Sequence, residues 1–265
     1  MRIRVPKRAT FAVALVLAIL TSCSYYVFNG HRRLSALTRS AAIRIDSADA
    51  QQSTDPEALL AAADHFYWLN NGTAAGPLYA RAEKLFSEKG DARNELHAKV
   101  GRLRSEAETM SFVELSRFLN EQLQNPIVHN DKKLRLWCLI AKGYTDIEID
   151  YRASKRDWLE AQDIAKSLGE DQWVTRASGE LGLIGFLEGN PGRAARLLGG
   201  ALLSTMANGD TGGQVRFLEL LGRGFEEVNR HAEALKFFER AIKLAEAVAF
   251  STHRVRPVPF GSSVL

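Results

Sequence analysis

The sequence predicts an all-α fold in which antiparallel helix pairs stack on one another behind an apolar N-terminal helix. Apolar residues make up 46% of the 265 residues, which is enough for a sizeable core. Only seven prolines interrupt the chain, and β-branched residues are not clustered, which favours helix over strand. From Asp55 onward a pattern of apolar and small residues recurs at a nearly constant interval, which is typical of repeat proteins.

Residues 1–28 predict a signal peptide or a membrane anchor. Four basic residues precede an apolar run at 9–20, and small residues follow it, as in secretory signals: Arg2, Arg4, Lys7 and Arg8. The stretch Leu20-Thr21-Ser22-Cys23 resembles the bacterial lipobox. That resemblance implies cleavage before Cys23, linkage of its thiol to diacylglycerol, and anchoring by the lipid tails.

A second interpretation keeps this segment as an uncleaved anchor. Apolar residues resume at 25–28, and the eighteen residues from Phe11 to Phe28 are just long enough to cross a bilayer. The two interpretations agree on location. Both predict a body that is membrane-anchored and extracytoplasmic, in the periplasm or cell envelope.

Residues 29–54 are predicted to be a juxtamembrane linker, because their last part is polar. The formal net charge of +4 comes entirely from the N-terminal end, and no acidic residue precedes Asp46. Without residues 1–22 the counts are 35 − 4 = 31 basic and 31 acidic. A neutral remainder provides no electrostatic reason to expect nucleic-acid binding.

The repeat is clearest near the C-terminal end. A first helix there is followed by the breaker Asn229-Arg230 and by a second helix; its landmarks are Leu218, Gly222, Phe225, Ala234, Phe238 and Ala241. This unit resembles the tetratricopeptide repeat (TPR), with Leu218 in place of the family's first aromatic residue. The resemblance extends over residues 55–249 and implies about five helix pairs wound as a right-handed α-solenoid.

One residue of each predicted first helix marks the period: Ala63, Gly101, Lys142, Gly182 and Gly222. The intervals are 38, 41, 40 and 40 residues, longer than the 34 of a usual TPR. A small residue at this point lets the second helix approach closely. Since a helix pair cannot bury its apolar face alone, neighbouring pairs are expected to stack.

Residues 250–265 are predicted to be an irregular tail, because they contain Pro257 and Pro259 and have no helical period. No polar capping helix is evident. One interpretation is a repeat region shortened from a larger signalling or peptidase-type protein, in which it would be regulatory. The alternatives are a tail that folds back as a cap and a partner that covers the exposed face.

No motif in the sequence indicates catalysis, so we expect a protein that is not an enzyme. The six histidines are scattered, no zinc spacing or phosphate-binding loop is present, and we expect no metal and no cofactor. The acids from Asp146 to Asp150 alternate as in a calcium loop, but Tyr151 stands where that loop needs glycine. Cys138 lies in an apolar run and is expected to be a buried thiol.

The predicted function is therefore to hold a protein or peptide partner on the concave face, with no nucleic acid and no small-molecule substrate evident. TPR arrays line this face with first helices. In the frame above it carries Asp64, Tyr67, Arg102, Arg176, Arg216, Glu219, Arg223 and Glu226. The Lys and Asn set with which some TPR proteins clamp a C-terminal carboxylate is absent. Trp137 and Trp158 are expected between repeats, and Trp68 at least partly exposed.

Overall fold

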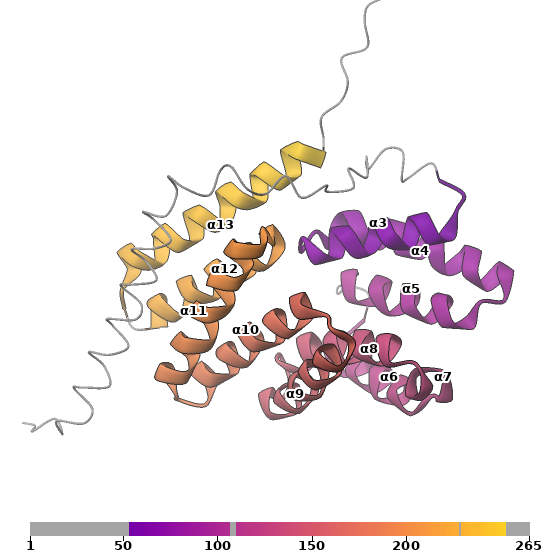
Figure 1. Cartoon of the computed structure of the whole chain (residues 1–265), viewed down its shortest axis with the longest axis horizontal. Helices are drawn as coiled ribbons and strands as arrows, with labels where there is room; N and C mark the ends of the chain where they lie inside the picture. Colours follow the sequence, from indigo (N-terminus) through magenta and orange to yellow (C-terminus); the bar gives the residue numbers. More distant parts are fainter. Residues whose placement is uncertain (1–52, 107–109, 228, 253–265) are drawn as a thin grey trace, which may run out of the picture.

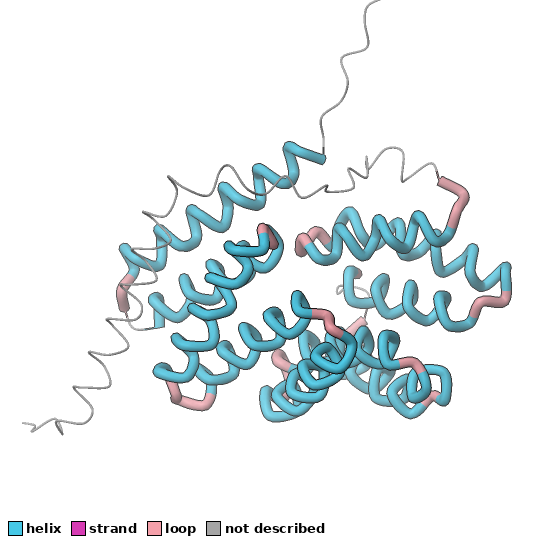
Figure 2. The backbone as a smooth tube through the Cα atoms, viewed as in Figure 1, coloured by secondary structure: helices cyan, strands magenta, loops and turns pink. Residues whose placement is uncertain are grey.

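The computed structural model describes residues 53–106, 110–227 and 229–252. This part of the chain is helical throughout, without strands, which confirms the all-α prediction (Figures 1 and 2). The expected signal or anchor, Cys23, the linker up to residue 52 and residues 253–265 of the tail lie outside it. Within these described ranges, no helix combines the length and the apolar character needed to cross a bilayer.

Consecutive helices pack against one another along the chain (Figure 1). In order they are α3 (Pro56–Trp68), α4 (Gly72–Lys89), α5 (Ala92–Ser105), α6 (Phe112–Gln124), α7 (Pro126–Asn130), α8 (Lys132–Asp146), α9 (Tyr151–Leu168), α10 (Asp171–Leu187), α11 (Pro191–Asn208), α12 (Thr211–Glu227) and α13 (His231–Thr252). The last helix continues three residues beyond Ala249, where the sequence pattern predicts that helical periodicity ends.

Two of the short turns between helices combine a glycine that ends one helix with an aspartate that caps the next. Gly90 and Gly209 end α4 and α11 with φ of 72° and 69°, a left-handed conformation that favours glycine. The next residue in each case caps the following helix. Asp91 accepts a hydrogen bond from the Asn94 amide, and Asp210 accepts one from the Gly213 amide. Helices joined so tightly are held side by side.

Glycines allow close approaches between helices. A Cβ at Gly182 would lie 2.9 Å from the Leu198 side chain, and one at Gly222 would lie 2.7 Å from the Phe238 ring. Both neighbours belong to the second helix of the same pair, as the repeat pattern predicts. In the third pair the close approach is at Gly143, where a Cβ would lie 2.7 Å from the Trp158 indole nitrogen.

The second helix pair is irregular. α5 packs mainly against α4, whereas α6 packs mainly against α8, and the short helix α7 lies between α6 and α8 in the chain. Accordingly, a Cβ at Gly101 would meet the Tyr79 ring of α4, at 2.5 Å, and not a side chain of α6. Phe118 lies in α6, and the sequence pattern around it does not reveal that α6 packs mainly on α8 rather than on α5.

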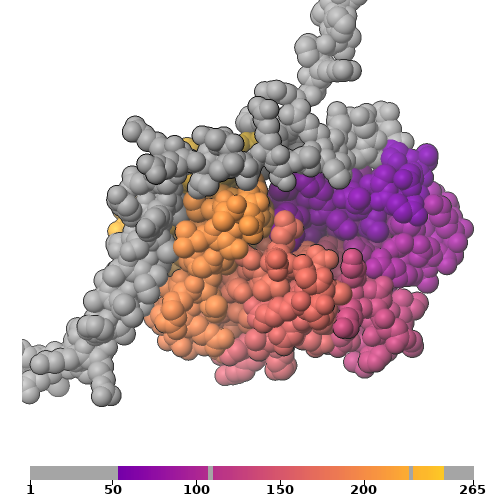
Figure 3. Space-filling model, in the orientation of Figure 1, coloured from indigo at the N-terminus to yellow at the C-terminus, as the bar shows by residue number. Residues whose placement is uncertain are grey.

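The chain curves so far that its first described helix meets the turn between α11 and α12. The Trp68 indole N–H donates a 2.7 Å hydrogen bond to Asp210, which lies between α11 and α12. The Asn70 amide lies 3.5 Å from the Gly212 carbonyl oxygen. Figure 3 shows the indigo surface of α3 beside the orange surface of α12. The array of helices therefore closes on itself at this contact, and we call this closure the enclosure.

Candidate binding site enclosed by the helices

Two cavities lie on the inner face, and Trp68 and Trp173 line both. The larger has a volume of about 920 Å³ and the smaller about 340 Å³. These volumes fall in the range of sites that bind small molecules or partner side chains. Because the two tryptophans are common to both, they form the wall between the cavities.

Three tryptophans from three helices form an aromatic surface in the larger cavity. Trp68 ends α3, Trp137 lies in α8 and Trp173 lies in the first turn of α10. Trp173 packs edge-to-face against Trp68, with ring centroids 4.7 Å apart, and against Trp137 at 6.4 Å. Edge-to-face contacts of this kind stabilise aromatic clusters beyond simple burial. The rings are thus held in place before any ligand arrives.

A polar network borders the same surface. Asp64 accepts a 2.7 Å hydrogen bond from the Tyr79 hydroxyl and lies 3.0 Å from His97 Nε2. The His97 ring stacks on Trp137, with centroids 4.7 Å apart. Burial raises the pKa of Tyr79, and the negative charge of Asp64 raises it further, so Tyr79 remains a neutral donor. Asp64 is therefore held in place by two side chains from other helices.

The smaller cavity has a different character. Three arginines line it, together with two tyrosines: Arg104, Arg176, Arg216, Tyr67 and Tyr144. Burial raises the pKa of both tyrosines, so they are neutral hydroxyl groups. Glu148 and Glu219 also contribute to the lining. This side of the enclosure is rich in guanidinium groups.

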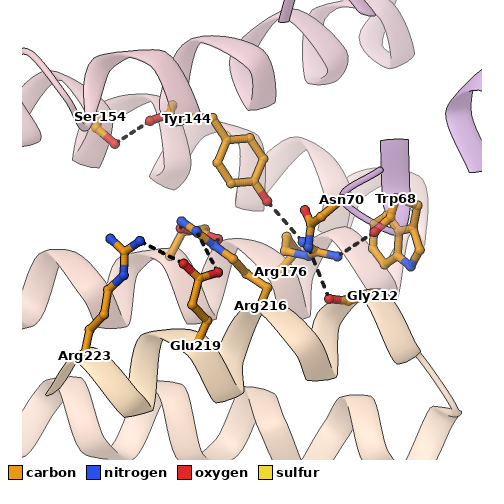
Figure 4. Close-up of polar contacts among 11 residues, drawn as sticks. Trp68, Asn70, Tyr144, Ser154, Arg176, Gly212, Arg216, Glu219 and Arg223 are labelled. Atoms are coloured by element: carbon orange, nitrogen blue, oxygen red, sulfur yellow. Dashed lines mark hydrogen bonds and ion pairs between the residues drawn. The ribbon is translucent and has the colours of Figure 1, made fainter. Parts of the chain in front are cut away.

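Arg176 lies at the centre of this region, and only 2% of it is exposed (Figure 4). Its guanidinium donates hydrogen bonds of 3.3 Å to the Tyr144 hydroxyl and to the Trp68 carbonyl oxygen. It also lies over the Trp68 ring, 4.6 Å from the centroid. Arg216 forms a paired contact with Glu180, at 2.9 and 3.0 Å. These contacts connect α3, α8, α10 and α12.

The structure brings four of the eight predicted partner-binding residues together. Tyr67, Arg176, Arg216 and Glu219 line the smaller cavity, and Asp64 lines the larger one. The other three, which line neither cavity, are Arg102, Arg223 and Glu226. Arg102 binds Glu83 at 2.6 Å, and Arg223, which is 61% exposed, binds Glu219 at 2.8 Å. Glu226 is exposed.

The tryptophans differ in their surroundings. Trp158 is 1% exposed and fills the space beside Gly143 within its helix pair, and Trp68 is half-buried against Arg176. Trp137 is 7% exposed, yet it lines the larger cavity. The sequence interpretation did not single out Arg104 or Tyr144 for the site. The repeat pattern in the sequence did point to Arg176 and Arg216, because each lies six residues before the glycine that marks its repeat unit.

The acidic stretch after Cys138 has a structural explanation. Asp146 is buried and accepts a hydrogen bond from Lys142, and the Asp150 side chain caps α9. In the ranges that the structure describes, no group of three or more His, Cys, Asp or Glu side chains is placed to hold a metal ion.

Comparison of the sequence with models of protein families finds no match, and comparison with curated proteins finds none either.

Proposed function

We propose that this chain is a membrane-tethered scaffold that holds a segment of a partner protein on the inner face of a TPR-like array. The observation that carries this proposal is the larger cavity, in which three tryptophans from α3, α8 and α10 form a preorganised surface. Tryptophan is among the residues most enriched where binding energy is concentrated in protein interfaces. The proposed role is capture without turnover.

The TPR-like solenoid is part of this proposal. The helices pair in sequence, and close approaches at Gly182 and Gly222 have the arrangement that the repeat pattern requires. A right-handed superhelix of such pairs directs first helices inward. Here α3, α8 and α10 supply the tryptophans, and all three are first helices in the predicted frame.

The chemistry of the larger cavity favours a segment with a basic side chain. Aromatic faces attract cations, most strongly when the rings are tryptophans. Asp64, Glu170 and Asp210 also line the cavity, against the single lysine Lys133 in its lining. A lysine or arginine of a partner would find both aromatic faces and carboxylates there. A strongly acidic segment is not expected to bind.

Site-specific photo-crosslinking in cells tests the capture. A photoreactive amino acid at Gln172, which is exposed and lines the larger cavity, is expected to crosslink one recurrent partner. The matched control carries the same group at Lys84, on α4, whose side chain is 78% exposed and which lines neither cavity. A Trp173→Leu substitution is expected to lower the yield at Gln172. Equal yields from Gln172 and Lys84, or no effect of Trp173→Leu, would contradict the proposal.

The tether is proposed from residues 1–28. Lipid labelling of wild type and Cys23→Ser in cells, with the mass of the mature N-terminus, distinguishes its two forms. A labelled protein that begins at Cys23 supports a lipoprotein in the envelope. An unlabelled full-length protein in the membrane fraction supports an uncleaved anchor. Recovery in the soluble fraction without label contradicts both.

A further inference from the structure

Two of the three arginines that line the smaller cavity have no ionic partner within 4.0 Å in the described part of the chain, although Glu148 and Glu219 also line it. Glu180 is bound by Arg216, and Glu219 is bound by Arg223 from outside the cavity. Neither Arg104 nor Arg176 has a carboxylate within 4.0 Å among the residues that the structure describes. Burying a charged group without an ionic partner is costly in free energy. For Arg176, at 2% exposure, this cost is expected to be large.

Hydrogen-bonding groups beside the cavity are also unused. The Nε atoms of Arg104 and Arg176 and the hydroxyl of Ser105 are buried, and they have no hydrogen-bond partner within the described part of the chain. All three residues line the smaller cavity. Buried polar groups in native proteins are nearly always satisfied, so three unsatisfied groups in residues that line one cavity favour an additional acceptor beside them. Each of these atoms exposes less than 1 Å², so a ligand in the cavity would contact it only after a small movement of the side chain.

The N-terminus of α4 adds partial positive charge beside the smaller cavity. Gly72, the first residue of α4, lines the cavity, and the N-terminus of a helix carries a partial positive charge. The aromatic walls are Tyr67, Trp68, Tyr144 and Trp173. The arrangement therefore combines two guanidinium groups without ionic partners, a helix N-terminus and flat apolar surfaces.

We propose that the smaller cavity binds a small oxyanion, the carboxylate or phosphate group of a low-molecular-weight ligand, between Arg104 and Arg176. Guanidinium groups bind both of these anions through paired hydrogen bonds. The volume of about 340 Å³ suits a compact ligand and is too small for a folded partner. This site is separate from the larger cavity, so the proposal does not depend on capture of a partner segment.

The bound anion would also strengthen the enclosure. Arg176 connects α10 to α3 through the Trp68 carbonyl oxygen and to α8 through Tyr144. An anion that neutralises Arg176 lowers the cost of keeping its charge buried. Binding is therefore expected to raise the thermal stability of the protein, because a ligand that binds only the folded state stabilises it.

Titration with defined anions tests the site. The intact protein is titrated with inorganic phosphate, benzoate and phenyl phosphate at constant ionic strength, with chloride as the reference. Tryptophan fluorescence and calorimetry are recorded, since Trp68 and Trp173 line the cavity. We expect at least one probe to bind saturably at low millimolar concentration or below and to raise the melting temperature. Benzoate alone would identify a carboxylate site, and phosphate or phenyl phosphate alone would identify a phosphate site.

Three variants separate binding from folding. Arg104→Gln and Arg176→Gln each remove one charge and are expected to raise Kd by about tenfold or more, the usual effect of losing a hydrogen bond to a charged group. Arg104 is half-buried, so its variant is expected to fold even if Arg176→Gln does not. Arg196→Gln removes the same charge from an exposed position of α11 that lines neither cavity, and it is the control. The proposal fails if no probe binds more tightly than chloride, or if Arg104→Gln binds as tightly as Arg196→Gln.

Discussion

Trp68 and Asp210 are separated by 142 positions in the sequence, yet the indole nitrogen lies 2.7 Å from a carboxylate oxygen. The same oxygen of Asp210 accepts the Gly213 amide at 2.9 Å and so caps α12. Asp210 is 7% exposed, which strengthens both hydrogen bonds by excluding water. One carboxylate thus caps α12, the first helix of the fifth pair, and joins it to α3.

Removing this carboxylate should destabilise the protein and loosen the enclosure. Asp210→Ala leaves the Trp68 N–H and the start of α12 without an acceptor, which is expected to cost about 2–3 kcal/mol in the free energy of unfolding. Urea denaturation measures this cost. Small-angle X-ray scattering should show a larger radius of gyration. Asp210→Asn retains an acceptor oxygen and is the milder control.

A double-mutant cycle isolates the hydrogen bond between the two residues. Trp68→Phe removes the indole N–H, and its effect is expected to shrink when Asp210 is already alanine, with a coupling of about 1 kcal/mol. Strictly additive losses in the urea experiments would mean that Trp68 and Asp210 do not stabilise each other.

Glycine at position 212 is expected to be essential for the contact between α3 and α12. A Cβ there would lie 2.2 Å from the Trp68 carbonyl oxygen, a distance that real side chains do not show. Gly212→Ala should therefore cost about 2 kcal/mol or more, because the backbone of α3 must move away. Thermal denaturation measures the loss.

A second glycine provides the control for this substitution. A Cβ at Gly200, inside α11, meets nothing within 4 Å. Gly200→Ala should stabilise the protein by about 0.5–1 kcal/mol, since alanine favours helix over glycine. Equal effects of the two substitutions would show that α3 does not contact α12 in solution.

The helical content and the spacing of the repeat were predictable from local sequence patterns. Each helix pair must bury its apolar face against a neighbour, so similar residues recur at similar positions. Gly182 and Gly222 mark close approaches that the structure contains. The third unit shows the limit of such matching. The pattern marked Lys142, but the neighbour Gly143 makes the close approach to Trp158, and Lys142 instead binds Asp146 and Asp157. A sequence pattern does not reveal that a charged side chain will be buried with two carboxylates.

The enclosure was not predictable in the same way. Whether Trp68 meets Asp210 depends on small rotations between successive helix pairs, and these add up along the whole array. The irregular second pair, in which α6 packs mainly on α8, changes that sum. Tyr67, Arg176, Arg216 and Glu219 line the smaller cavity together. Their contacts with Tyr144 and Glu180 join helices of successive pairs, and the sequence pattern does not specify them.

The thiol of Cys138 is expected to be unreactive in the folded protein. The residue is fully buried, and burial raises the pKa of its thiol to about 12, so almost no thiolate exists at pH 8. In a Cys23→Ser variant, a thiol-reactive dye should label the protein only after denaturation with guanidinium chloride. Rapid labelling without denaturant would mean that α8 is not packed as the structure shows.

Stability should depend on pH through Asp157, which is buried beside Lys142 Nζ at a distance of 2.9 Å. Burial raises the pKa of Asp157 from 3.8 to about 6, although the hydrogen bond from Lys142 opposes the shift. Because the pKa is higher in the folded state, folding takes up a proton between these values. The stabilising contribution is present in acid and is lost as the pH rises through about 6.

Asp157→Asn removes this titration while keeping the shape of the side chain. The free energy of unfolding of wild type minus that of Asp157→Asn should therefore fall by about 2 kcal/mol between pH 4 and pH 7, since one pKa unit corresponds to about 1.4 kcal/mol. Urea denaturation at a series of pH values measures the difference. Asp163→Asn, on the same helix but 78% exposed, should show no comparable dependence. A difference that stays flat or rises with pH for Asp157→Asn would mean that the carboxylate is better stabilised in its charged form, and that Lys142 outweighs the effect of burial.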